Sequence, residues 1–115
     1  MPPAPLPNHP QPFQQDDELI VIHPDTVAAR LLPQFLARRV EDLALIDQEL
    51  ARAGYRAIER VGHNLKGIGR TYGMDGISEI GAVLEKAGQR HDATEIRKQA
   101  AALAEYLRRV QIAPA

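Results

Sequence analysis

Apolar residues recur at spacings of three and four along most of the chain from residue 24 to residue 110, which places them on one face of a helix. The pattern predicts four main helices, at about 33–53, 55–72, 75–88 and 92–110. A shorter helix is expected to start near Pro24 or Asp25 and to end or bend at Pro33. Short connections favour antiparallel neighbours, so we expect an all-α fold, an antiparallel up-down four-helix bundle with a short additional N-terminal helix.

Each expected helix carries one apolar stripe that should face the core of the bundle. The short helix and the helix at 33–53, which should end at Gly54, have these apolar residues: Val27, Leu31, Leu32, Phe35, Leu36, Val40, Leu43, Ile46 and Leu50. The stripe of the helix at 55–72 comprises Ile58, Val61, Leu65, Ile68 and Tyr72. That of the helix at 75–88 comprises Ile77, Ile80, Val83 or Leu84, and Ala87. That of the helix at 92–110 comprises Ile96, Ala100, Leu103, Leu107 and Val110. Asp92, with Glu95 three residues on, is typical of a capping box at the start of the last helix.

The N-terminal region differs in composition from the rest of the chain. Residues 1–15 contain six prolines, so we expect residues 1–18 to form an extended or mobile leader, with a proline-rich ligand for a partner domain as the alternative. The apolar run 19–22 could be a strand, but with no second strand evident we expect it to lie extended against the bundle. The bundle is therefore expected over 19–112, with a short tail at 113–115.

The helix expected at 55–72 carries a histidine away from its apolar stripe. The five apolar residues of that stripe lie within an arc of roughly 80°, at about 100° per residue, and His63 lies on nearly the opposite side. Lys66 and Arg70 follow His63 by one and two turns, and Glu59 precedes it by one turn. A neutral imidazole is a competent nucleophile near pH 7, because its unperturbed pKa is about 6.5.

Glycines are concentrated around this histidine. All eight glycines of the chain lie between residues 54 and 88, and each one in a helix interior costs about 1 kcal/mol relative to alanine. Gly67 shares the face of His63, so its missing side chain should leave open space beside the imidazole. Gly62, Gly69 and Gly81 lie nearer the buried stripes and should let neighbouring helices approach closely. The pattern predicts an exposed histidine that is cleared on one side and flanked by cations.

Around this histidine the sequence reads His63-Asn64-Leu65-Lys66-Gly67, and Tyr72-Gly73 follows a few positions later. This motif resembles the signature of the histidine-containing phosphotransfer (HPt) domains of bacterial phosphorelays. The resemblance covers roughly residues 24–110, since Phe35-Leu36 with Arg38-Arg39, and the segment 77–85, look like the neighbouring helices of such domains. Ile68 is a departure, because many relatives carry a small residue at that position.

The resemblance implies a phosphorelay intermediate that accepts a phosphoryl group on His63 from a receiver-domain aspartate and passes it to another receiver domain. Lys66 and Arg70 would balance the charge of the phosphoryl oxygens, and Glu59 or another acceptor could orient the ring. The expected docking residues are Glu59, Gly62 and Gly67. One surface around His63, built by its own helix and the helix 33–53, should serve donor and acceptor alike. The implied partners are response-regulator receiver domains and a hybrid histidine kinase.

Other features limit the remaining functions. The formal net charge of −1 gives no reason to expect nucleic acid, and the absence of cysteine excludes disulfides and thiolate metal sites. The apolar runs are too short for a membrane span, and no secretion signal is evident, so a cytoplasmic monomer that acts alone is expected. No ATP-binding loop or kinase signature is present. We therefore expect a carrier rather than an enzyme, with no cofactor of its own and with Mg²⁺ supplied by the receiver.

Three other interpretations remain open. A non-phosphorylated docking module could bind a receiver domain or histidine kinase, although the intact His63, Lys66 and Gly67 argue against it. A purely structural bundle could dimerise through residues 19–22. Glu59 and His63 could form half of a metal site, but the sequence offers no further ligand to complete it.

Overall fold

The computed structural model describes residues 19–22 and 26–112. Its elements, in chain order, are β1 (Ile20–Ile22), α2 (Thr26–Ala51), α3 (Tyr55–Ile68), the 3₁₀ turn η1 (Gly69–Tyr72), α4 (Asp75–Gln89), α5 (Ala93–Arg109) and β2 (Val110–Ile112). The expected leader at 1–18 and the expected tail at 113–115 lie outside the described residues, as does the side chain of Val27.

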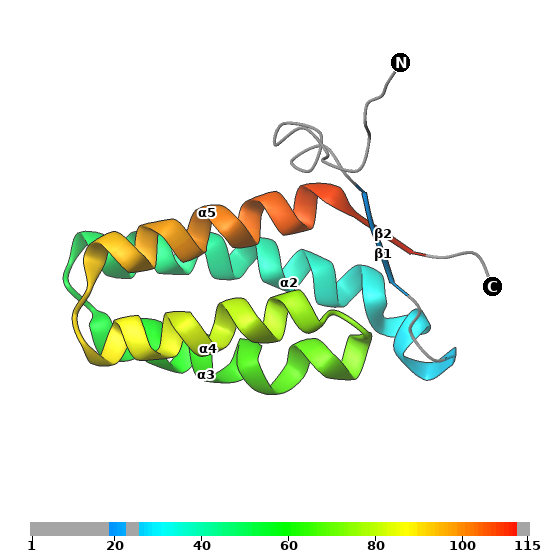
Figure 1. Cartoon of the computed structure of the whole chain (residues 1–115), viewed down its shortest axis with the longest axis horizontal. Helices are drawn as coiled ribbons and strands as arrows, with labels where there is room; N and C mark the ends of the chain where they lie inside the picture. The colour runs from blue at the N-terminus through cyan, green and yellow to red at the C-terminus, as the bar shows by residue number, and fades with distance from the viewer. Residues whose placement is uncertain (1–18, 23–25, 113–115) are drawn as a thin grey trace, which may run out of the picture.

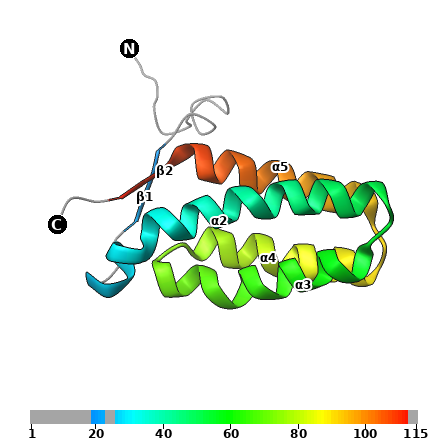
Figure 2. The same ribbon diagram turned by 180° about the vertical axis from the view of Figure 1, so that it is seen from behind.

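Successive helices run in opposite directions and pack as a bundle, with α2 beside α5 and α3 beside α4 (Figure 1). The view from behind shows the same pairing, with both short strands at one end of the bundle (Figure 2). This arrangement confirms the expected all-α, antiparallel four-helix fold. Within the described residues no helix is both long and apolar enough to cross a membrane.

Side chains from all four helices fill the core, together with Met74 from the connection between η1 and α4. The buried hydrophobic residues are Leu32, Phe35, Ile46, Ile58, Val61, Leu65, Met74, Ile77, Leu84, Ala87, Ile96 and Leu103. Most of the other expected core residues are partly buried and pack against this cluster. The apolar stripes therefore identified the inner faces of the helices.

Three expected core residues are instead exposed, namely Leu31, Val40 and Val83. On α4 the inward position belongs to Leu84, which was the alternative to Val83. On α2 the buried line passes through Arg39 rather than Val40. The hydrophobic pattern missed this position because a charged residue occupies the place on the helix face where an apolar one was expected.

The expected start of the short helix, near Pro24 or Asp25, lies outside the described residues. Within them no separate helix precedes α2, which runs without interruption from Thr26 through Pro33 to Ala51. A proline inside a helix removes one backbone hydrogen bond and costs about 3 kcal/mol. Leu32 and Phe35, on either side of Pro33, are both buried in the core. Their burial holds the helix together across the proline, so the expected short helix forms the first turns of α2.

The apolar run near the N-terminus is a paired strand rather than an isolated extended segment. β1 pairs in parallel with β2, and Ile20 lies opposite Val110. Val110 has φ −69° and ψ 139°, so α5 ends at Arg109 and the chain becomes extended where the sequence pattern continued the helix. The second strand was missed because Val110 also fits the apolar spacing of α5. The pairing joins the two ends of the described chain.

Candidate functional site

His63 lies near the middle of α3 on its outer face. Ile58, Val61 and Leu65 of the same helix are buried, whereas the side chain of His63 is 67% exposed. This confirms the predicted placement opposite the apolar stripe. A partner protein can therefore reach the imidazole from solvent.

A carboxylate from α4 contacts both His63 and Lys66. Nδ1 of His63 lies 2.9 Å from Oε2 of Glu85, and Nζ of Lys66 lies 2.7 Å from Oε1 of the same side chain. The hydrogen bond from Lys66, followed by that from His63, lowers the pKa of Glu85 below its usual range. Glu85 is therefore ionised at neutral pH and can only accept hydrogen bonds.

This contact selects one form of the imidazole. Because the Glu85 carboxylate is an acceptor, Nδ1 of His63 must carry the proton that it donates. In the neutral ring the lone pair then resides on Nε2. The nucleophilic nitrogen is thus the one that Glu85 does not engage.

Of the two alternatives for orienting the ring, Glu59 or another acceptor, the structure shows the second. Glu59 lies one turn before His63, but its Oε2 accepts a hydrogen bond from Nε2 of Gln89. Glu85 contacts the ring instead, and it is 22 residues away along the chain. Positions on one helix face could not reveal it. The available signal was the pair Gly62 and Gly81, whose close approach determines which turn of α4 lies against His63.

These two glycines bring the backbones of α3 and α4 together. A Cβ atom on Gly62 would lie 2.4 Å from the backbone nitrogen of Glu85, and one on Gly81 would lie 2.3 Å from the backbone nitrogen of Lys66. Side chains at either position would push the helices apart. Gly62 is buried in this contact, so its expected place on a docking surface is replaced by a role in helix packing.

Gly67 has the opposite environment. A Cβ atom there would meet nothing within 4 Å, in agreement with the predicted open space beside the imidazole. Gly67 and His63 line a hollow of about 450 Å³, which Arg39 of α2 also lines. A second hollow, of about 250 Å³, shares Arg39 and Ile68 with the first and continues along α2 to Leu31. The face between α2 and α3 is therefore hollowed beside the histidine.

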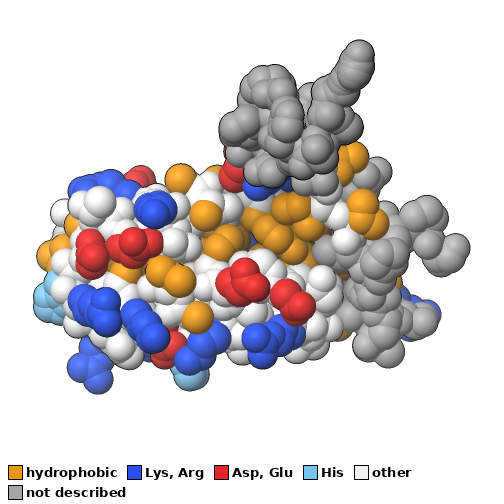
Figure 3. All heavy atoms as spheres, viewed as in Figure 1, with side chains coloured by type: hydrophobic (Ala, Val, Ile, Leu, Met, Phe, Trp, Pro, Cys, Tyr) orange, Lys and Arg blue, Asp and Glu red, His pale blue; other side chains and the backbone are white. Residues whose placement is uncertain are grey.

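The two predicted cations differ in their contacts. Lys66 is paired with Glu85 yet remains 47% exposed. Arg70 lies in η1, where its backbone nitrogen donates to Oγ of Ser78 and its side chain is exposed. Lys and Arg side chains also gather along the edge of the α3–α4 side (Figure 3). Of the two predicted cations, Lys66 therefore has a contact in common with His63, namely Glu85.

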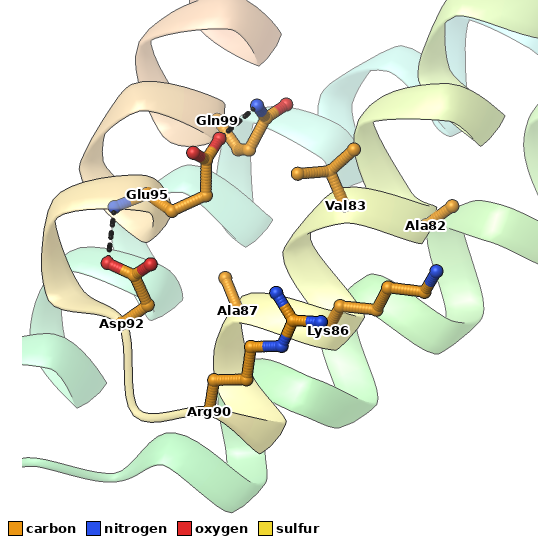
Figure 4. Close-up of a pocket in the computed structure, with 8 residues that line it drawn as sticks. All are labelled: Ala82, Val83, Lys86, Ala87, Arg90, Asp92, Glu95 and Gln99. Carbon is orange, nitrogen blue, oxygen red and sulfur yellow. Dashed lines mark hydrogen bonds between the residues drawn. The ribbon is translucent and has the colours of Figure 1, made fainter.

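Another groove, of about 370 Å³, lies between α4 and α5. Lys86 and Arg90 extend along it, while Asp92 and Glu95 lie at the start of α5 (Figure 4). Asp92 caps that helix by accepting from the backbone nitrogen of Glu95, which confirms the expected N-terminal cap. The residues that line this groove include no histidine, cysteine or serine nucleophile, so it offers no phosphoryl acceptor comparable to His63.

Among the described residues, the site has no cluster of metal-ligating side chains. Within the described part of the chain no group of three or more histidine, cysteine, aspartate or glutamate side chains could hold an ion. Both carboxylate oxygens of Glu85 are already engaged, by His63 and by Lys66.

This geometry presents His63 as an accessible nucleophile. The ring is accessible, its proton is held on the side of Glu85, and space remains open on the side of Gly67. Comparison of the sequence with known proteins points to the same chemistry. The model of the Hpt domain matches residues 30–113, whereas the curated proteins and the solved structures yielded no match. The family supports a role in phosphotransfer within two-component signalling. Since the match spans more than half of the chain, the protein belongs to the Hpt domain family.

Proposed function

We propose that this protein is a phosphorelay intermediate, in which His63 accepts a phosphoryl group from a receiver-domain aspartate and passes it to another receiver. The observation that carries the proposal is the hydrogen bond between Nδ1 of His63 and Glu85, which leaves Nε2 as the exposed nucleophile. The partners are receiver domains and a hybrid histidine kinase in the cytoplasm. The receiver supplies the Mg²⁺.

In the proposed step, the lone pair of Nε2 attacks the phosphorus of an aspartyl phosphate on the receiver. The new N–P bond forms as the P–O bond to the aspartate breaks, and the aspartate leaves as a carboxylate with the bonding electrons. The ring keeps its proton on Nδ1 and therefore gains positive charge. The anionic Glu85, 2.9 Å from Nδ1, offsets that charge. The second transfer reverses these steps with a different aspartate.

Lys66 and Arg70 are proposed to stabilise the phosphoryl oxygens. Phosphoryl transfer has a loose transition state, so catalysis depends on positioning and charge compensation. An ammonium group has three donors, so Lys66 can keep its bond to Glu85 and still reach a phosphoryl oxygen. The exposure of both side chains supports these roles.

The proposed docking surface is the face between α2 and α3, and donor and acceptor use it in turn. Two adjoining hollows run along this face from His63 to Leu31. Leu31, an exposed apolar residue, lies at the far end and provides a contact for the apolar surface of a partner. Gly67 keeps the near end open.

Incubation with a phosphorylated receiver tests the function. We expect the wild type to acquire an acid-labile label and His63→Gln to acquire none. The control is His91→Asn, which changes a second exposed histidine; asparagine is chosen because residue 91 has φ 55°, which asparagine tolerates. This variant should be labelled normally. Binding of the receiver without any labelling of the wild type would instead indicate a docking module.

A further inference from the structure

A buried cation on α2 adjoins the site but has no role in the function described so far. Arg39 is only 9% exposed, although arginine is rarely buried unless it is paired. It lies one turn after Phe35, on the face of α2 that packs against the core. The long side chain therefore occupies a position that an apolar residue would normally fill.

Two contacts hold this guanidinium in place. Its Cζ lies 4.5 Å from the centroid of the Phe35 ring, and that ring stacks on Tyr72 with centroids 4.1 Å apart. Its Nε lies 3.0 Å from Oδ2 of Asp42. Both contacts of Arg39 come from α2 itself, and the Phe35 ring connects this group to Tyr72 of the η1 turn.

One buried donor of Arg39 has no hydrogen-bond partner. Its Nε has no hydrogen bond of good geometry, and Asp42 is the only anionic contact of the guanidinium among the described residues. Unsatisfied buried donors are costly. Other atoms of the side chain line the hollow that His63 and Gly67 also line, which places a positive charge beside any group that enters it.

We propose that Arg39 forms a phosphoryl-binding subsite with Gly67, in which the phosphoryl group on His63 occupies the hollow and accepts hydrogen bonds from the guanidinium. This inference rests on the proposed function, because it concerns the same phosphorylated histidine. A guanidinium matches two phosphoryl oxygens at once. Gly67 provides the space and Arg39 the charge, on the side of the ring opposite to Glu85.

Phosphorylation without a receiver isolates this role from docking. His63 would be phosphorylated with phosphoramidate, and the phosphohistidine followed by ³¹P NMR. We expect Arg39→Gln to slow labelling about tenfold, the loss of one charge-assisted hydrogen bond, and to change the ³¹P shift of the phosphohistidine. The matched control is Arg38→Gln, which removes the same charge from an exposed neighbour that does not line the hollow of His63. It should behave as the wild type.

A second measurement uses the unaltered protein, in case Arg39→Gln fails to fold. In ¹⁵N-labelled wild type, the guanidinium signals of Arg39 should shift on phosphorylation while those of Arg38 stay in place. Unchanged Arg39 signals in a fully phosphorylated sample would overturn the proposal, as would labelling of folded Arg39→Gln at the rate of Arg38→Gln. A wild type that takes no label on His63 would refute the proposed function itself, which is a distinct result.

Discussion

The two sides of α3 are built in opposite ways from the same residue type. Toward α4, Gly62 and Gly81 let the backbones meet, and a Cβ on either would lie within 2.4 Å of a backbone atom. Toward α2, Gly67 faces open space. Glycine therefore serves close packing on one side and access on the other.

This difference explains how the histidine can be both positioned and reachable. Glu85 comes from α4, so its distance to His63 depends on the close contact of α3 with α4. The open side carries no such constraint and leaves the hollow beside Gly67 free for a partner. A change on the packed side should therefore damage the fold and the site together, whereas a change on the open side should damage transfer alone.

The largest expected effect comes from filling the packed side. Gly81→Ala places a Cβ 2.3 Å from the backbone nitrogen of Lys66, so α3 and α4 must separate. We expect a loss of at least ~3 kcal/mol in the free energy of unfolding, measured by urea denaturation. Gly67→Ala is the matched control, and it should be neutral or stabilising by up to ~1 kcal/mol because the same methyl group meets no neighbour. Equal stabilities of the two variants would contradict the comparison.

The sequence was sufficient for features that arise within one helix. The apolar spacing located the inner face of each helix, and the position of His63 relative to that stripe predicted its exposure. The motif around His63 and Gly67 identified the family, which the match over residues 30–113 confirms. Each of these depends on neighbours in the sequence and on the regular geometry of a helix.

Features that join two elements were not predictable in the same way. Glu85 was missed because its contact with His63 depends on how α4 is aligned along α3, which no periodicity specifies. The pairing of β1 with β2 was missed because three residues at the end of a helical stripe do not signal a strand. Arg39 was missed because burial of its charge depends on the Phe35 ring and Asp42 together. Tertiary packing decides such cases.

A substitution on the open side, at Gly67, should change stability less than one on the packed side, but it should slow phosphoryl transfer strongly. Gly67→Gln places a long side chain in the space next to His63, and its Cβ meets no atom within 4 Å in the free protein. Helicity should be kept, because glutamine is a better helix former than glycine. Phosphoryl transfer from a receiver should slow at least tenfold, on the order of 1.4 kcal/mol in activation free energy, as measured by loss of label from the donor. Gly67→Ala should fall between this variant and the wild type, and normal transfer in Gly67→Gln would refute the role assigned to the glycine.

The smallest effect on phosphoryl transfer is expected from removing the charge of Glu85, the α4 residue that contacts His63. Glu85→Gln keeps an oxygen that can accept from Nδ1 of His63 but removes the charge that offsets the phosphorylated ring. Transfer should therefore slow only a few-fold, whereas Glu85→Ala, which also removes the acceptor, should slow it about tenfold. Ring ¹⁵N shifts should show the proton on Nδ1 in the wild type and a mixture of tautomers in Glu85→Ala. Glu79→Gln, an exposed change on the same helix, is the control.

The same variants separate a charge effect from a packing effect through pH. Since Lys66 and His63 lower the pKa of Glu85 in the folded protein, the bridge stabilises the fold fully above the unfolded-state value of 4.5. That contribution is lost as the pH falls through the folded-state pKa. The difference in unfolding free energy between wild type and Glu85→Gln should thus shrink as the pH falls below about 4.5. A difference that persists unchanged at pH 3 would mean that Glu85 stabilises the fold by packing. Its negative charge would then not contribute to the stability of the contact between α4 and His63.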